Sequence, residues 1–199
     1  IVDDSWADGD RANTGPLQAD WWSSSSTSGN SVEASVGALG LISGTSGRGI
    51  HGTFAPQVLG VGDTLTATAT FMTPATVGTG KGGAFRFAMM DLNDSGLAAD
   101  LSSSSSSVNP LYTSLPGYMV DFDVNTGETA DTSLRKHQVP NTSGRFLGTT
   151  GEWDQMGTGP DEGYTFDATT EYVAVFSITR TGADSMDIFS SMSQGATLM

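Results

Sequence analysis

Hydrophobic and polar residues alternate with a period of two over most of the chain. The clearest run covers residues 63–73, in which threonines alternate with apolar residues. Because successive side chains of a strand point to opposite faces, this run predicts a strand with one core face and one solvent face. Its apolar face consists of Leu65, Ala67, Ala69 and Phe71. Similar runs cover residues 34–42, 48–55, 83–91, 117–124, 133–138, 145–148, 171–180 and 185–190.

This pattern predicts an all-β fold. Helical periodicity is nearly absent, and Gly, Pro, Ser, Asn and Asp interrupt the chain at short intervals. About nine strands need two packed sheets, because a single sheet of this width curls or splits. We therefore expect a two-sheet antiparallel β-sandwich of jelly-roll type, formed by residues 1–199 as a single domain. Two serine-rich tracts, 23–28 and 102–107, are expected to be mobile loops because they bury too little apolar surface to become ordered.

The end of the chain departs from a closed sandwich. Residues 171–180 and 184–190 predict a hairpin around a turn at 181–183, and the chain stops soon afterwards at Met199. Sandwiches usually pair a last strand near the first, which leaves no exposed edge. We therefore expect either that the last strands are missing because this is a fragment of a longer chain, or that another chain donates a strand.

Charge and composition exclude several functions. The chain has 8 Lys and Arg against 22 Asp and Glu, a formal net charge of −14. So few cations cannot form the basic surface that nucleic acid or an anionic membrane requires. The absence of cysteine excludes disulfides, thiolate nucleophiles and cysteine-based metal sites. No run approaches the ~20 apolar residues of a membrane span, and the acidic, Ser/Thr/Gly-rich composition indicates a secreted or cell-surface protein.

Three segments together carry a family resemblance. They are residues 3–11 with Asp20-Trp21-Trp22, residues 117–123, and residues 172–181. These segments resemble the concanavalin A-like (LamG-like) jelly-roll domains of secreted proteins from marine and environmental bacteria, many of which carry a PEP-CTERM sorting tail. The resemblance implies a jelly roll with sugar binding or surface display, brings no catalytic residues, and implies further strands beyond Met199.

Two acidic segments are candidates for structural calcium. Asp91, Asn93 and Ser95, followed by Gly96, match the first half of a calcium loop, in which alternate side-chain oxygens converge on the ion. The twelfth position of this loop is Ser102 rather than glutamate, so a hairpin turn stabilised by Asp and Asn is the alternative.

The second segment offers four oxygen ligands within eight residues. They are Asp121, Asp123, Asn125 and Glu128. Asp121 and Asp123 share one strand face, and the alternative interpretation is a solvated strand end. The same two carboxylates lie roughly 7 Å apart, a spacing compatible with a glycosidase, but the E-x-D-x-x-E pattern of laminarinase-like jelly rolls is missing.

The few cations predict a mixed-charge groove. By alternation, His51 and Arg86 point away from the apolar faces of their strands, as do Asp121 and Asp123, toward a surface that can hold an acidic polysaccharide. A polysaccharide lyase would use Arg86 to neutralise a uronate, His51 or His137 as base and Tyr118 as acid. The sequence motifs of alginate lyases are absent, however, and Tyr118 alternates onto the apolar face.

Four aromatic residues in loop-like surroundings are candidates for stacking on sugar rings: Trp21, Trp22, Trp153 and Tyr112. The alternative is that one tryptophan closes the end of the sandwich, with one of the Trp21–Trp22 pair inside and the other outside. Our leading hypothesis is a non-catalytic extracellular β-sandwich that binds carbohydrate or serves as a surface or matrix protein. The alternatives are a structural subunit that assembles with copies of itself into a filament or surface layer by strand exchange, and an acidic-polysaccharide lyase.

Overall fold

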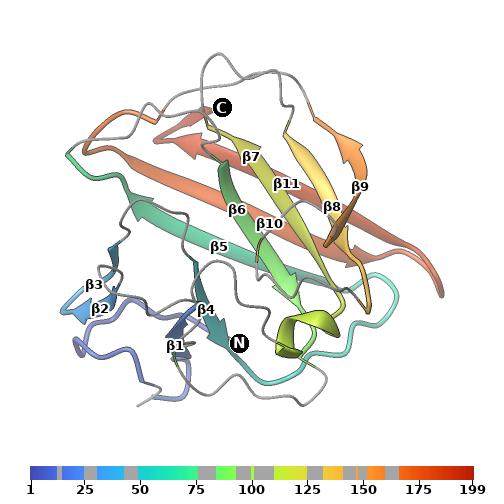
Figure 1. Ribbon diagram of the computed structural model, residues 1–199, viewed down its shortest axis with the longest axis horizontal. Helices are drawn as coiled ribbons and strands as arrows, with labels where there is room; N and C mark the ends of the chain where they lie inside the picture. The colour runs from blue at the N-terminus through green and yellow to red at the C-terminus, as the bar shows by residue number, and fades with distance from the viewer. Residues whose placement is uncertain are drawn as a thin grey trace. The chain divides into compact units, whose positions relative to one another are not determined.

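The computed structural model describes residues 1–12, 15–24, 31–42, 49–75, 84–92, 100, 110–124, 132–140, 147, 152–159 and 166–199. Within these residues the chain forms strands and one short 3-10 helix, so the all-β prediction is confirmed (Figure 1). The strands are β1 (Asp20–Ser23), β2 (Ser31–Ser35), β3 (Ala38–Ile42), β4 (Ile50–Thr53), β5 (Thr64–Met72), β6 (Ala84–Met90), β7 (Gly117–Asp123), β8 (Ser133–His137), β9 (Trp153–Thr158), β10 (Glu171–Arg180), β11 (Met186–Gln194) and β12 (Thr197–Leu198), and the helix is η1 (Pro110–Thr113).

The chain forms two compact units, each assembled from three segments. Unit 1 comprises Ile1–Pro56, Asp91–Pro116 and Gln138–Glu152. Unit 2 comprises Gln57–Met90, Gly117–His137 and Trp153–Met199. Unit 1 therefore holds β1 to β4 with η1, and unit 2 holds β5 to β12.

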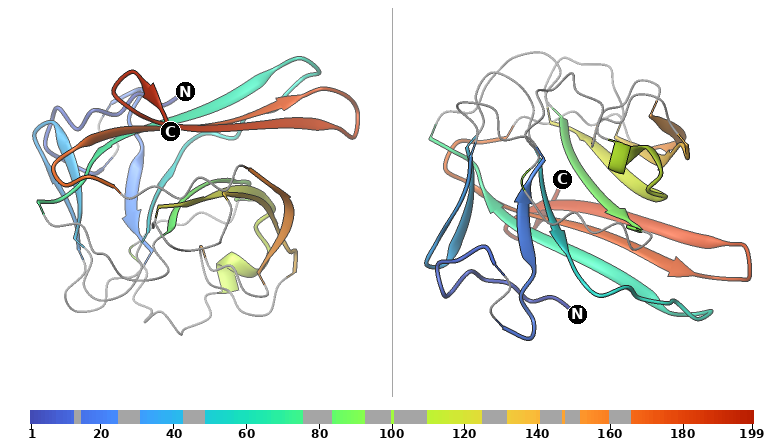
Figure 2. Two further views of the ribbon diagram at one scale, coloured as in Figure 1. Left: turned by 90° about the horizontal axis from the view of Figure 1, so that it is seen from above. Right: turned by 60° about the horizontal axis from the view of Figure 1, so that its bottom comes forward.

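Unit 2 consists of two four-stranded antiparallel sheets that lie one over the other (Figure 2, left). Their strand orders are β12-β11-β10-β5 and β6-β7-β8-β9. Aromatic rings from both sheets meet between them: Phe71 stacks on Phe85 with centroids 4.6 Å apart, and Phe87 lies 6.2 Å from Phe176. The buried centre consists of Val120, Phe122, Tyr172, Ala174, Phe176 and Met192. This arrangement is compatible with the predicted β-sandwich, and its jelly-roll connectivity stays a prediction.

The alternation read from the sequence determines which side chains reach this core. In β5 the four threonines are exposed and the apolar residues between them are half-buried. In β10, Tyr172, Ala174, Phe176 and Ile178 are all buried, and the residues between them are not. A shift of one residue in either strand would place the polar side chains in the core, so the alternation specifies which face of each strand lies inward.

Unit 1 contains two smaller antiparallel sheets, β1 with β4 and β2 with β3. The prediction of one strand over residues 34–42 is wrong, because a turn at Val36 and Gly37 divides this segment between β2 and β3. Gly37 has a φ of +82°, a left-handed conformation that glycine adopts without the steric cost of a Cβ atom.

Several other predictions need correction. Strands β1 and β9 lie where loops were expected, and β11 continues to Gln194. Ser23, assigned to a mobile tract, is the buried last residue of β1, while residues 25–28 and 102–107 lie outside the described part of the chain. In the segment 145–148 only Leu147 is described, and it lies in a turn. Among the residues that the structure describes, no helix has the length and apolar character needed to cross a bilayer.

Candidate functional site

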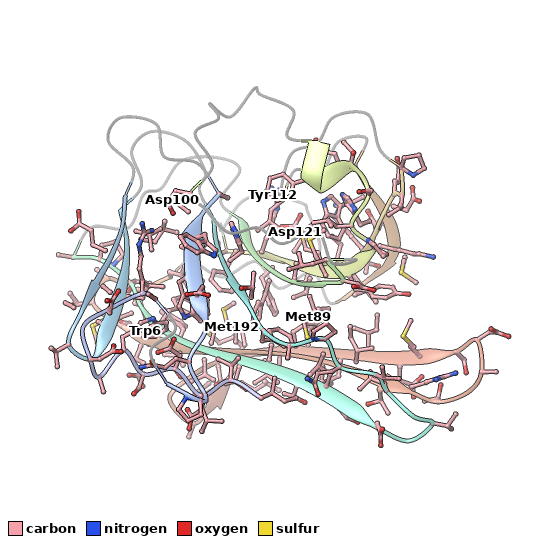
Figure 3. The ribbon with its side chains drawn as sticks, turned by 90° about the horizontal axis from the view of Figure 1, so that it is seen from below. Trp6, Met89, Asp100, Tyr112, Asp121 and Met192 are labelled. Atoms are coloured by element: carbon pink, nitrogen blue, oxygen red, sulfur yellow. The ribbon has the colours of Figure 1, made fainter. Side chains whose placement is uncertain are left out.

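A row of hydrogen-bonding side chains crosses the β6–β9 sheet on the face opposite the core. We call it the polar row; it consists of Arg86, Asp121, Ser133, Arg135 and Gln155. Each of its four strands contributes at least one residue, because Arg86 is paired with Asp121, Asp121 with Ser133, and Arg135 with Gln155. Figure 3 labels Asp121 on this face and Met89 on the core face. The sequence prediction that Arg86 and Asp121 point away from the apolar face is therefore confirmed.

Asp121 binds two arginines. The Arg86 Nε–H donates to Asp121 Oδ1 at 3.0 Å, and Arg135 Nε lies 3.6 Å from Asp121 Oδ2. The side chain of Asp121 is 12% exposed, and those of Arg86 and Arg135 are 29% and 19% exposed. Because these groups are largely withdrawn from water, the carboxylate compensates two guanidinium charges that would otherwise repel each other.

Within the described residues, the guanidinium of Arg135 is hydrogen-bonded through its Nε–H group but not through its terminal nitrogens. Its Nε–H donates to Ser133 Oγ at 3.0 Å, which orients the planar guanidinium. Neither terminal nitrogen of Arg135 donates a hydrogen bond within the described part of the chain. A guanidinium that is oriented in this way and keeps two parallel N–H donors matches the two oxygens of a carboxylate.

The polar row changes the expectation of calcium at Asp121. A carboxylate already bound to two cations is a poor calcium ligand, because a third positive charge would be repelled. The other candidate calcium ligands, apart from Asp91, lie outside the described part of the chain: the Asp123 side chain, Asn125, Glu128, Asn93 and Ser95. The expectation of a calcium loop that begins at Asp91 stays a prediction.

The residues expected of a lyase do not converge. Tyr118 packs on the core side of β7, as its alternation predicted, so Arg86 and Tyr118 lie on opposite faces of their sheet. His137 is buried, with its ring 4.6 Å from that of Trp153. His51 belongs to unit 1, whereas the other three residues belong to unit 2. The prediction that His51 points to an open surface is wrong, because its side chain is buried. Within unit 2, His137 and Tyr118 are therefore not placed as the base and acid of one reaction.

Two of the four expected sugar-stacking residues are buried. Trp153 is 3% exposed and lies in β9, not in a loop, and Tyr112 is 2% exposed and lies in η1. Burial also raises the pKa of the Tyr112 hydroxyl well above its ordinary value. Neither ring has a face that can stack on a sugar in this structure.

Trp21 and Trp22 are both half-buried on opposite faces of β1, so the expected division into one inside and one outside is wrong. The Trp21 ring covers Gly52, where an added Cβ would meet the ring at 3.0 Å, and its Nε1–H donates to Asp4 at 2.7 Å. Trp6 packs against the same ring at 5.4 Å. The Asp- and Trp-rich opening of the chain therefore holds unit 1 together locally.

A second ionic cluster lies in unit 1, around Asp100 (Figure 3). Arg11 donates to both Asp100 oxygens, at 2.9 and 2.7 Å, and the Ser23 amide donates to the same carboxylate at 2.8 Å. The Arg11 guanidinium also lies 5.9 Å from the centre of the Trp22 ring. The hydrogen bond from Arg11 is the main reason why the pKa of Asp100 is lowered. Through this cluster, hydrogen bonds link β1 to Asp100, and Asp100 to Arg11.

His51 makes unit 1 sensitive to acid. Burial lowers the pKa of His51 from the ordinary 6.5 to about 4, although the Asp100 charge opposes this shift. As pH falls below 6.5 the unfolded chain takes up a proton before the folded chain does, so stability is lost toward acid. We expect this effect of His51 to lower the free energy of unfolding of the wild type by about 2 kcal/mol between pH 7.5 and pH 5. Urea unfolding of the wild type and His51→Gln at both pH values measures this difference, and parallel pH dependences would contradict it.

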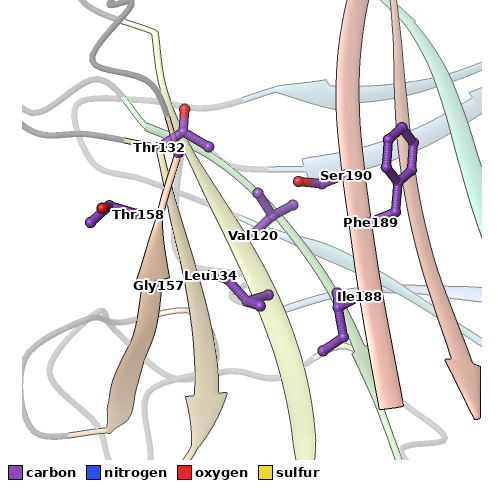
Figure 4. A pocket seen from close by; sticks show the side chains of 9 residues that line it. Val120, Thr132, Leu134, Gly157, Thr158, Ile188, Phe189 and Ser190 are labelled. Atoms are coloured by element: carbon purple, nitrogen blue, oxygen red, sulfur yellow. The ribbon is translucent and has the colours of Figure 1, made fainter. Parts of the chain in front are cut away.

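A groove of about 330 Å³ opens elsewhere in unit 2, on the core side of the β6–β9 sheet (Figure 4). Val120 and Leu134 line one side, and Ile188 and Ser190 of β11 line the other. Figure 4 shows Phe189 turned away from these side chains. The groove contains hydroxyl groups but no charged side chain, and it lies on the face opposite the polar row.

Sequence reasoning missed two of the polar residues described above, Gln155 and Asp100. Gln155 was overlooked because β9 is short and contains Gly157, although Trp153 and Gln155 alternate onto one face. Asp100 was counted only as part of an acidic region, because no local pattern indicates a partner 89 positions away. Comparison with protein-family models, curated proteins and solved structures found no match for this chain.

Proposed function

We propose that this protein is a non-catalytic, extracellular β-sandwich that binds an acidic polysaccharide through the polar row. The observation that supports this proposal most directly is the Arg135 guanidinium, which is oriented by Ser133 and keeps its terminal N–H groups for a ligand. A uronate carboxylate would accept two parallel hydrogen bonds from these groups.

The rest of the polar row suits the hydroxyls of an extended sugar chain. Asp121 supplies acceptor oxygens, and Gln155 supplies both a donor and an acceptor. Four strands span roughly 14 Å across the sheet, about the length of three sugar residues. Because each side chain lies on a hydrogen-bonded strand, the row is largely ordered before the ligand arrives, which lowers the entropic cost of binding.

Binding without chemistry is the function that this geometry favours. Bond cleavage in a uronate chain needs a base and an acid on the same side of the sugar. Among the described residues of the β6–β9 sheet, Tyr118 lies on the other face and His137 is buried. The proposal of a secreted or cell-surface location rests on the acidic, cysteine-free composition.

Replacement of Arg135 tests the proposal. We expect Arg135→Gln to weaken binding to polygalacturonate or alginate about tenfold, equivalent to about 1.4 kcal/mol, because the charged bidentate contact is lost. Affinity electrophoresis in gels that contain each polysaccharide, with a neutral β-glucan for comparison, measures this effect.

Lys136→Gln is the matched control, because it removes one positive charge from the neighbouring, exposed position of β8, which alternates to the opposite face. It should retain wild-type binding. Equal loss in both variants would indicate non-specific electrostatics, and no binding by the wild type would overturn the proposal. A rise in absorbance at 235 nm during incubation would instead support the lyase alternative.

A further inference from the structure

Strand β5 has one paired edge and one open edge. It pairs with β10, and no other strand of the described chain is hydrogen-bonded to it. At the ends of this pairing, the Thr73 N–H donates to the Thr170 carbonyl and the Arg180 N–H donates to the Asp63 carbonyl, each at 3.0 Å. The odd-numbered residues of β5 therefore face β10, since antiparallel strands bond at every second residue. The even-numbered residues, from Thr64 to Met72, direct their N–H and C=O groups to the open edge.

The chemistry of this edge is unusual for the protein. Among the described strands of seven or more residues, β5 alone has no charged side chain, although the whole chain carries a net charge of −14. The edge also contains no proline, lysine or bulge, the devices that usually prevent a strand edge from pairing with another chain. The same even-numbered residues are also the exposed residues of β5.

We propose that β5 pairs with the β5 of a second copy, antiparallel and around a two-fold axis through Thr68. In this register Thr68 faces its own copy, Thr66 faces Thr70, and Thr64 faces Met72. All of these residues direct their backbone groups to the open edge, so the two strands form about ten hydrogen bonds. On the inner face Leu65 meets Phe71 of the second copy, so apolar side chains again meet apolar side chains.

The charge of the protein favours a second copy at this edge. Two molecules of charge −14 repel each other, so a stable contact needs a surface without ionised groups. The proposed register places no charged side chain opposite another along nine residues. The interface is small, and it therefore forms a reversible dimer that strengthens when salt screens the remaining repulsion. This dimerisation is independent of polysaccharide binding.

Cysteine cross-linking tests the register, because the native chain has no cysteine. In the dimer, Thr68→Cys places two thiols on opposing residues with Cα atoms about 5.5 Å apart, within reach of a disulfide. Thr64→Cys, on the same strand and face, places its thiols roughly 27 Å apart. In a glutathione redox buffer we expect Thr68→Cys to form a disulfide-linked dimer and Thr64→Cys to remain monomeric. A mixture of Thr64→Cys with Met72→Cys should form the mixed dimer.

Sedimentation velocity over a range of protein concentrations supplies a test without cross-linking. Thr68→Lys places two like charges face to face on the axis and should abolish the dimer. Ser191→Lys, on the same sheet face but in β11, should dimerise like the wild type. An equimolar mixture of Thr68→Lys and Thr68→Glu should dimerise again, which shows that both variants are folded. A monomeric wild type, equal cross-linking of Thr64→Cys and Thr68→Cys, or unchanged association of Thr68→Lys would overturn the proposal.

Discussion

Phe176→Ala should lower the free energy of unfolding of unit 2 by about 3–5 kcal/mol. Phe176 is fully buried in β10, and its ring meets Phe87 from the facing sheet. Removing the ring leaves a cavity between two hydrogen-bonded sheets that cannot collapse fully, so the cost includes both lost burial and lost packing. Since small domains are stable by only about 5–15 kcal/mol, this loss is a large part of the total. Urea unfolding followed by circular dichroism measures it.

Phe189→Ala is the matched control. Phe189 lies one strand away in β11, on the outer face of the same sheet, and is 58% exposed. Its removal should change stability by less than about 0.5 kcal/mol. If the two variants were equally destabilised, the core would not lie between the sheets as the structure places it.

Asp121→Ala should lower the free energy of unfolding of unit 2 by about 3 kcal/mol, because it leaves Arg86 and Arg135 side by side without the carboxylate that joins them. This value lies at the low end for a broken buried ion pair, because both arginines keep some contact with water. Asp121→Asn should cost less, since the amide oxygen can still accept a hydrogen bond from Arg86. The same urea titration measures both variants.

Asp187→Ala provides the comparison for Asp121, because Asp187 is exposed at the start of β11. This variant should remain within about 0.5 kcal/mol of the wild type. Equal stability of the Asp187→Ala and Asp121→Ala variants would show that Asp121 does not hold the two arginines in solution.

The alternation in the sequence predicted β5 and β10 well. In both strands every second residue is apolar over nine or ten positions, so the core face follows from the pattern. The same reasoning failed over residues 34–42, where Gly37 interrupts a run that otherwise suits one strand. It also missed β1, because the Asp20-Trp21-Trp22 segment packs half-buried side chains on both faces and shows no alternation.

The candidate site was predictable in part. Alternation placed Arg86 and Asp121 on the non-core faces of their strands, but a face does not specify a neighbour. That they bind each other depends on the pairing of β6 with β7, which is decided when the sheet forms. Arg135 is paired with Gln155 across an irregularity in register between Leu134 and Arg135, and no local signal in the sequence marks it.

By itself, the sequence determined the all-β class, the core faces of the long strands and the strongly acidic charge. These are local or additive properties, because a strand alternates wherever it lies and charges sum without reference to position. Only the tertiary structure decided which charges meet, such as Arg11 with Asp100, and which edge of β5 remains open. The physical reason is that strand order and register result from contacts between distant segments, whose formation the local pattern does not encode.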